Sequence, residues 1–211
     1  MNGAATQVTS VGKRLSPAQA VLVPCFFAAL LAAFVLLPPV RGNAGLQNTF
    51  LLAAGVLVAW ASALFIGIRK GQRVLTLELA VRRHHWVQAC AQGTVFFWWG
   101  RYVDLVYAFA PFIAAQLVFA YGVDALLQWS RRENYQLGFG PFPIIFSINL
   151  FLWFKPEWFH WQFAMILLGY LGKDLIRWTK DGRSAHIFNP SSFPLGVCSL
   201  VLIMTGMTEI T

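Results

Sequence analysis

The stretch between residues 172 and 196 separates two long apolar runs and ends in an Asn-Pro pair that is typical of a helix start. Four of the sixteen basic residues lie here: Lys173, Arg177, Lys180 and Arg183. The Asn189 side-chain oxygen can cap a helix by accepting from a backbone N–H two or three residues on, and Pro190 suits the first helical position. The pattern predicts a surface loop that leads into the partly positive start of a helix.

A second segment that begins with proline could contribute to the same site. Residues 141–154 begin Pro141-Phe142-Pro143 and contain Ser147 and Asn149. The segment is shorter than the roughly 20 residues that a full membrane span needs, so we interpret it as a broken or half-helix. The start of a half-helix offers unpaired N–H groups to an anion, and two such segments point to a binding site within the membrane. The alternative is that the prolines simply cap two ordinary helices.

Asp124 is the candidate for handling an ion or a proton. It lies in an apolar run with Gln128 four residues on, and an ionisable side chain inside a membrane is costly unless it has a role. Arg131 and Arg132 are less than two helical turns away, so structural pairing with them is an equally open interpretation.

Histidines could in principle hold a b-type haem, which needs two imidazoles facing each other at similar depth. His84 or His85 could meet His186 at the inner face, but polar anchoring at the interface is the preferred interpretation, and no haem is expected. The three cysteines, Cys25, Cys90 and Cys198, lie far apart in apolar runs, so no metal-binding spacing exists.

Composition identifies the class of protein that positions these residues. The chain has 211 residues, of which 58% are hydrophobic and 11% charged. Soluble domains are about one-quarter charged, so this composition predicts an integral membrane protein. The net charge of +8 would suggest nucleic acid as a partner of a soluble protein. Here the lipid bilayer is the expected partner instead, because the basic residues sit in short loops between apolar runs.

The expected fold is an all-α, polytopic membrane protein with about seven membrane segments. Residues 1–17 form a polar N-terminal tail, and residues 18–211 form a single transmembrane domain. Part of the basic connector 69–83 is expected to lie along the membrane interface as a short helix. The full spans are predicted at 18–40, 49–68, 84–99, 102–129, 158–178 and 187–207, with 141–154 as a further, incomplete crossing.

The distribution of Lys and Arg predicts the orientation. With the N-terminus on the cytoplasmic side of a bacterial inner membrane, thirteen basic residues fall in inside loops. The other three, Arg41, Arg101 and Lys155, fall outside. This excess agrees with the positive-inside rule and puts residue 211 on the outer side.

Two motifs resemble a known family. Lys173-x-Leu175, Gly182 and His186-x-Phe188-Asn189-Pro190 resemble the D subunit of the Rnf electron-transport complex, whose family includes the B subunit of the sodium-translocating NADH:quinone reductase. The nearest likeness is to the RnfD-like proteins of enediyne gene clusters, called UnbU. It covers residues 82–211, and residues 139–147 and 186–190 are its most specific parts.

The resemblance implies a subunit of a multi-subunit membrane electron-transfer complex, with other membrane subunits as partners. It implies flavin (FMN or riboflavin) or quinone near the cytoplasmic half-helix ends, lined by His186, Phe188, Asn189, Pro190, Ser191, Ser147 and Asn149. The family attaches FMN to a threonine in a Ser-x-x-Thr type motif that is absent here, so this sequence is expected to be part of a longer chain. The alternative is an accessory membrane subunit, or a transporter- or channel-like protein, without a cofactor.

Overall fold

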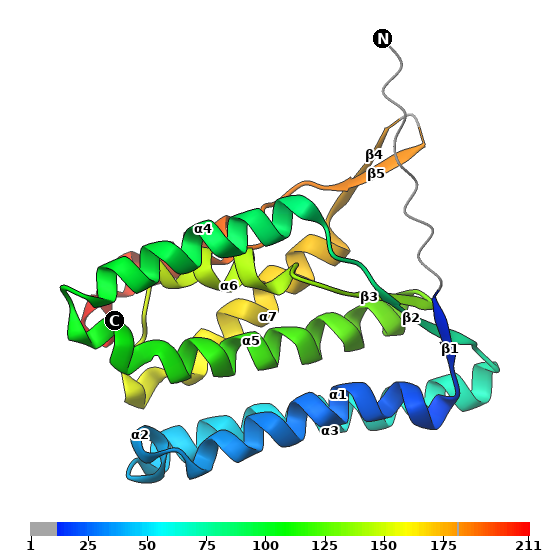
Figure 1. Ribbon diagram of the computed structural model, residues 1–211, viewed down its shortest axis with the longest axis horizontal. Helices are drawn as coiled ribbons and strands as arrows, with labels where there is room; N and C mark the ends of the chain where they lie inside the picture. Colours follow the sequence, from blue (N-terminus) through cyan, green and yellow to red (C-terminus); the bar gives the residue numbers. More distant parts are fainter. Residues whose placement is uncertain (1–11, 181) are drawn as a thin grey trace.

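The computed structural model describes residues 12–180 and 182–211. The chain is mostly helical, and its helices lie side by side in an elongated bundle with small β-structures at one end (Figure 1). Within the described residues, three helical stretches are long and apolar enough to cross a membrane: Pro17–Leu36, Ala44–Gly71 and Asp104–Arg131.

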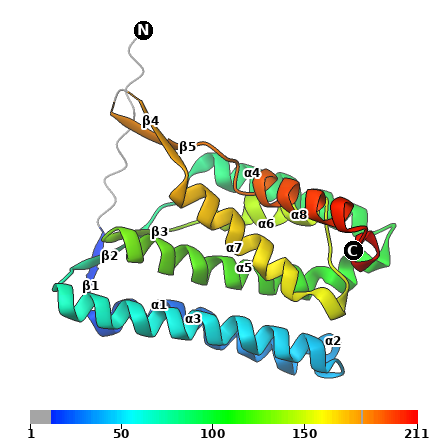
Figure 2. The ribbon, with the colours of Figure 1, turned by 180° about the vertical axis from the view of Figure 1, so that it is seen from behind.

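The first two of these stretches form a helical hairpin along one side of the bundle (Figures 1 and 2). Helix α1 (Pro17–Ala33) continues as the 3₁₀ turn η1 (Phe34–Leu36), and the short α2 (Pro38–Arg41) leads into α3 (Ala44–Gly71). Ser16 and Gln19 form a reciprocal capping box at the start of α1. The Pro38-Pro39 pair ends the first span as predicted, because proline cannot continue a helix by donating an N–H.

Helix α5 (Asp104–Arg131) lies at the centre of the bundle and packs against α1, α3, α4, α6 and α7. It supplies much of the buried core, and Pro111 stands inside it without ending it. Around it, Phe50 stacks on Phe159 with ring centroids 5.8 Å apart, and Phe109 stacks on Trp153 at 4.5 Å. Many of the nineteen phenylalanines and nine tryptophans therefore serve core packing.

The second half of the bundle contains shorter helices. Helix α4 (Arg83–Gly100) and helix α8 (Ser192–Thr205) flank the short α6 (Pro141–Asn149), while α7 (His160–Leu175) packs against α5 and α8. The 3₁₀ turns η2 (Pro156–Trp158) and η3 (Thr208–Ile210) lie before α7 and after α8. The expected incomplete segment is confirmed as a helix, which ends at Asn149, five residues earlier than the predicted segment.

Buried amides satisfy the backbone where α6 breaks. Gln116 and Asn149 exchange hydrogen bonds, and the Gln162 side chain donates to the Leu152 carbonyl at 3.4 Å and accepts from the Phe154 N–H at 3.3 Å. Irregular backbone within a bundle is stable only when such partners replace water. Asn149 therefore fixes the end of α6. It was predicted to line the binding site, but it lines neither of the two cavities described below.

Two small sheets correct the all-α expectation. Strand β2 (Leu75–Leu79) pairs antiparallel with β1 (Lys13–Leu15) and parallel with β3 (Asn134–Leu137). Strands β4 (Arg177–Lys180) and β5 (Arg183–His186) form a hairpin that extends past the helix ends (Figure 1). The predicted interfacial helix within 69–83 is wrong, because Leu75, Leu77 and Leu79 alternate with Thr76 and Glu78, a period typical of a strand.

Candidate functional site

Two adjoining cavities open at the end of the bundle that carries the β-structures. The larger has a volume of about 460 Å³ and the smaller about 220 Å³. Both are lined by His85, Gly140, Lys173 and His186, so they form one continuous site. Their combined size lies in the range of sites that bind small molecules and cofactors.

The smaller cavity brings together most of the predicted site residues. His186, Asn189, Pro190 and Ser191 line it from the segment before α8, and Ser147 lines it from α6. The lining continues onto α4 through two glutamines, Gln88 and Gln92, and Gln92 donates to the Ser147 hydroxyl at 2.8 Å. The two proline-started segments thus meet at one cavity.

Asn189 makes the capping contacts expected of it. Its Oδ1 accepts from the Ser191 N–H at 2.9 Å and from the Ser192 N–H at 3.4 Å. The Ser191 hydroxyl also donates to this oxygen at 2.7 Å. The regular helix begins at Ser192, two residues later than the Asn-Pro pattern predicts, because Pro190 and Ser191 form a turn. These contacts hold the start of α8 against the cavity.

Basic side chains give the larger cavity a positive character. Its lining includes Arg82, Arg132, Lys173 and Arg177. Arg82 donates to Gln136 Oε1 at 2.7 Å, and the Gln136 amide donates to Glu78 at 3.2 Å. Lys173 places its Nζ 5.3 Å from the centre of the Tyr170 ring, a cation–π contact. The sheet thus helps to position Arg82 through Gln136 of β3 and Glu78 of β2, whereas Lys173 comes from α7 and Arg177 from β4.

Two carboxylates also line the larger cavity, and their surroundings differ. Asp174 pairs with Arg131 Nε at 3.0 Å and with Arg132 at 2.5 Å. Asp124 is 8% exposed and makes no ion pair within 4 Å in the described part of the chain. The arginines near Asp124 in sequence thus pair with α7 instead, which leaves Asp124 at the cavity wall.

Tyr170 is a further polar group that the sequence did not suggest. Its side chain is 1% exposed and lines the larger cavity, and its hydroxyl has no hydrogen-bond partner among the described residues. A buried hydroxyl without a partner is costly, so a ligand atom or water at this position would stabilise it.

His186 is held in its neutral form near pH 7. Partial burial, followed by the nearby charges of Lys173 and Arg177, lowers the pKa of His186 from its ordinary value. A neutral imidazole can donate one hydrogen bond and accept another, and it gains positive charge when an anion binds beside it.

Phe188 does not line either cavity. It stacks on Phe193 in the first turn of α8, with ring centroids 4.6 Å apart. Its role is to hold the turn against the helix, so this predicted site residue is structural. Lys173, Gln88 and Gln92 line the cavities but were not predicted as site residues. The sequence features that point to them are the Gly-Lys-Asp sequence and the helical spacing of the two glutamines.

No family model matches the chain, and neither a curated protein nor a solved structure matches it. The likeness to the RnfD family is therefore a hypothesis that rests on the motifs of the sequence. What the geometry itself offers is a polar, cation-lined cavity that suits a ligand with an anionic group.

Proposed function

We propose that this chain is a polytopic membrane subunit of an electron-transfer complex of the RnfD type, and that it binds a flavin or quinone at the cytoplasmic ends of α6 and α8. The observation that carries the proposal is the smaller cavity, where Ser147 of α6 meets His186, Asn189, Pro190 and Ser191. The motif that resembles the family and the second proline-started helix lie at one cavity.

The residues present fit a flavin phosphate. Lys173 lines both cavities and Arg82 lines the larger one, so a phosphate there would gain charge-assisted hydrogen bonds. Gln88, Gln92 and Ser147 offer polar groups to the ring system in the smaller cavity. A bound flavin supplies one- and two-electron transfer, and the chain's own residues bind and orient it. His186 stands where it can donate a hydrogen bond to the ligand.

Asp124 is proposed as the group that handles a proton or an ion beside this ligand. It lies at the wall of the larger cavity, and the other carboxylate there is held by two arginines. A carboxylate without an ion pair next to a redox ligand can exchange a proton with that ligand.

The proposed orientation has about seven membrane segments in a bacterial inner membrane, with the cavities at the cytoplasmic face. Ten of the sixteen basic residues belong to β1, β4, β5, the ends of α3, α5 and α7, and the start of α4, which all lie at one end of the bundle (Figure 1). The turns that contain Arg41, Arg101 and Lys155 lie toward the other end, together with residue 211 (Figure 1). This separation supports the orientation by the positive-inside rule.

A transporter-like protein without a cofactor is the second candidate. The observation that favours it is the polar lining of the smaller cavity, which continues along α4 from Gln88 to Gln92 and reaches Ser147 inside the bundle. A polar path of this kind suits permeation of an anion equally well.

The deciding experiment is an absorbance and fluorescence spectrum of the detergent-purified protein, with and without added FMN, before and after acid precipitation. Flavin that is released by acid supports non-covalent binding. Absence of any chromophore, together with no binding of added FMN or quinone, would contradict the electron-carrier proposal and favour the transporter.

A binding titration tests whether the cations recognise the phosphate. FMN is expected to bind more tightly than riboflavin, and Lys173→Gln is expected to weaken FMN roughly tenfold, as for loss of one charged hydrogen bond. Riboflavin affinity should change little. The matched control is Lys70→Gln, which removes the same charge at the end of α3, away from both cavities.

A further inference from the structure

The β4–β5 hairpin leaves the bundle directly at the end of α7. Strand β4 begins at Arg177, two residues after α7 ends at Leu175. The Ile187 N–H donates to the Ile176 carbonyl at 3.3 Å, so the pairing extends down to the helix end. The hairpin base therefore lies at the end of α7, and the strands extend beyond the helix ends (Figures 1 and 2).

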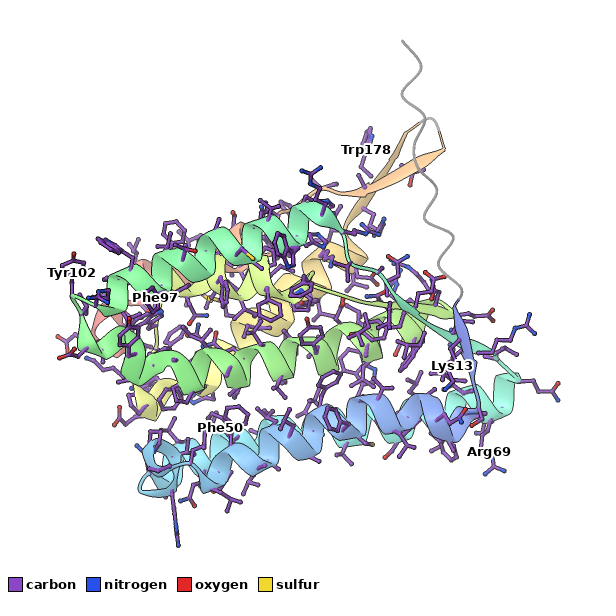
Figure 3. All side chains as sticks on the ribbon, in the orientation of Figure 1. Lys13, Phe50, Arg69, Phe97, Tyr102 and Trp178 are labelled. Carbon is purple, nitrogen blue, oxygen red and sulfur yellow. The ribbon has the colours of Figure 1, made fainter. Side chains whose placement is uncertain are left out.

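The residue types of the hairpin change along its length. Large apolar side chains are exposed at the base, where Leu175 is 52% and Ile187 54% exposed. Trp178 follows and is 62% exposed, standing clear of the helices (Figure 3). Lys180 and Arg183, which flank the turn, are cross-strand partners in the backbone register.

This sequence of apolar, aromatic and basic residues matches the layers of a membrane surface. Apolar side chains suit the boundary of the acyl chains, tryptophan is enriched at the headgroup level, and Lys and Arg attract anionic phosphates. Large apolar side chains are costly when they are exposed to water. The apolar side chains at the hairpin base are therefore expected to be covered by a binding partner.

We propose that the β4–β5 hairpin is a membrane-surface anchor that binds the anionic phospholipid headgroups of the cytoplasmic leaflet. Charge complementarity selects this partner, since residues 173–186 contain four Lys or Arg residues and His186 but only two acidic residues, Asp174 and Asp181. Asp174 is already paired with Arg131 and Arg132. Because Arg177 and His186 also line the larger cavity, headgroup binding would fix one wall of that cavity.

The test places a spin label at Thr179→Cys in the full chain, with Cys25, Cys90 and Cys198 replaced by Ala, reconstituted in vesicles. One set of vesicles contains phosphatidylcholine alone, and the other also contains phosphatidylglycerol. Collision of the label with oxygen is expected to rise at least twofold in the anionic vesicles, and collision with a water-soluble nickel chelate to fall. A label at Glu133→Cys, exposed at the same end, should not respond.

Charge variants identify the groups responsible. The double substitution Lys180→Gln and Arg183→Gln is expected to abolish the difference between the two vesicle types, as is high salt. The matched control, Arg69→Gln with Lys70→Gln at the end of α3, should retain it. Equal accessibility of the Thr179→Cys label in both vesicle types, or a difference that persists in the hairpin variant, would overturn the proposal.

Discussion

Gln116 of α5 and Asn149 of α6 exchange two hydrogen bonds in the interior of the bundle, at 3.0 Å and 2.7 Å between their side-chain nitrogen and oxygen atoms. Both residues are at most 1% exposed. Gln162 of α7 adds a third amide, donating to Gln116 Oε1 at 3.2 Å. Three helices are thus joined at the point where α6 ends.

Asn149→Ala is expected to destabilise the protein because it leaves the buried Gln116 amide partly unpaired. The cost should be about 1–3 kcal/mol in the free energy of unfolding, measured by denaturant titration in detergent. The double variant Gln116→Leu with Asn149→Leu should cost less than the sum of the two single leucine variants, since no amide is left without a partner. Additive effects would contradict the structural role of the pair.

In the described part of the chain, the three helices long and apolar enough to cross a membrane could be predicted from sequence, because each depends on its own apolar length. Residues 104–131 are apolar enough to predict a span whatever lies beside them. Strand β2 was missed because its partner β3 lies more than fifty residues away, and local composition does not report such pairing. The alternation from Leu75 to Leu79 was the available signal, and it was interpreted as an interfacial helix.

The part of the site that could be predicted is the part with a local signal in the sequence. Asn189 and Pro190 reveal a capped helix start locally, so the residues around them were found. The positions of Tyr170 and Arg82 in the cavity wall depend on how α7 and the start of α4 pack, which no short pattern encodes. Phe188 and Asn149 were assigned to the site by their neighbours in sequence, whereas packing turns one toward Phe193 and the other toward Gln116.

Gly169 allows the start of α8 to approach α7. A Cβ atom added at Gly169 would lie 2.3 Å from the Pro190 carbonyl oxygen and 3.1 Å from Pro194 Cγ. Gly169→Ala is therefore expected to displace the segment 189–194, to lower the melting temperature and to weaken ligand binding in the smaller cavity. Gly67→Ala in α3, where a Cβ would meet nothing within 4 Å, is the control and should be neutral or slightly stabilising. Unchanged binding in Gly169→Ala would show that the approach of α8 is not required.

Asp174→Asn removes the carboxylate that pairs with Arg131 and Arg132. The arginine side chains are about half exposed, so solvent screens the pairs, and a loss of about 1 kcal/mol in unfolding free energy is expected. The cavity also becomes more positive, so FMN affinity should rise severalfold at low salt and less at high salt. Asp104→Asn, at the other end of α5, serves as the control for a lost negative charge. A drop in FMN affinity would indicate that Asp174 instead orients a cation that binds the ligand.

The lowered pKa of His186 predicts how the stability of the folded state depends on pH. Burial and the charges of Lys173 and Arg177 lower the pKa of His186 below 6.5, its ordinary value. The unfolded chain then binds a proton more readily than the folded one. The folded state therefore loses stability as the pH falls below 6.5 toward the lowered pKa, and above 6.5 this loss is absent.

The affinity for an anion is expected to rise as the pH falls, whereas the stability contribution of His186 falls. A bound phosphate favours the protonated imidazole, so FMN affinity is expected to increase as the pH falls from 7.5 to 5.5, by several-fold more than riboflavin affinity. His186→Gln should flatten this pH dependence while keeping a hydrogen-bond donor in place. His160→Gln, which removes a histidine at the start of α7 and away from both cavities, should leave the dependence intact. Equal pH profiles in the wild-type protein and His186→Gln would exclude His186 from contact with the bound anion.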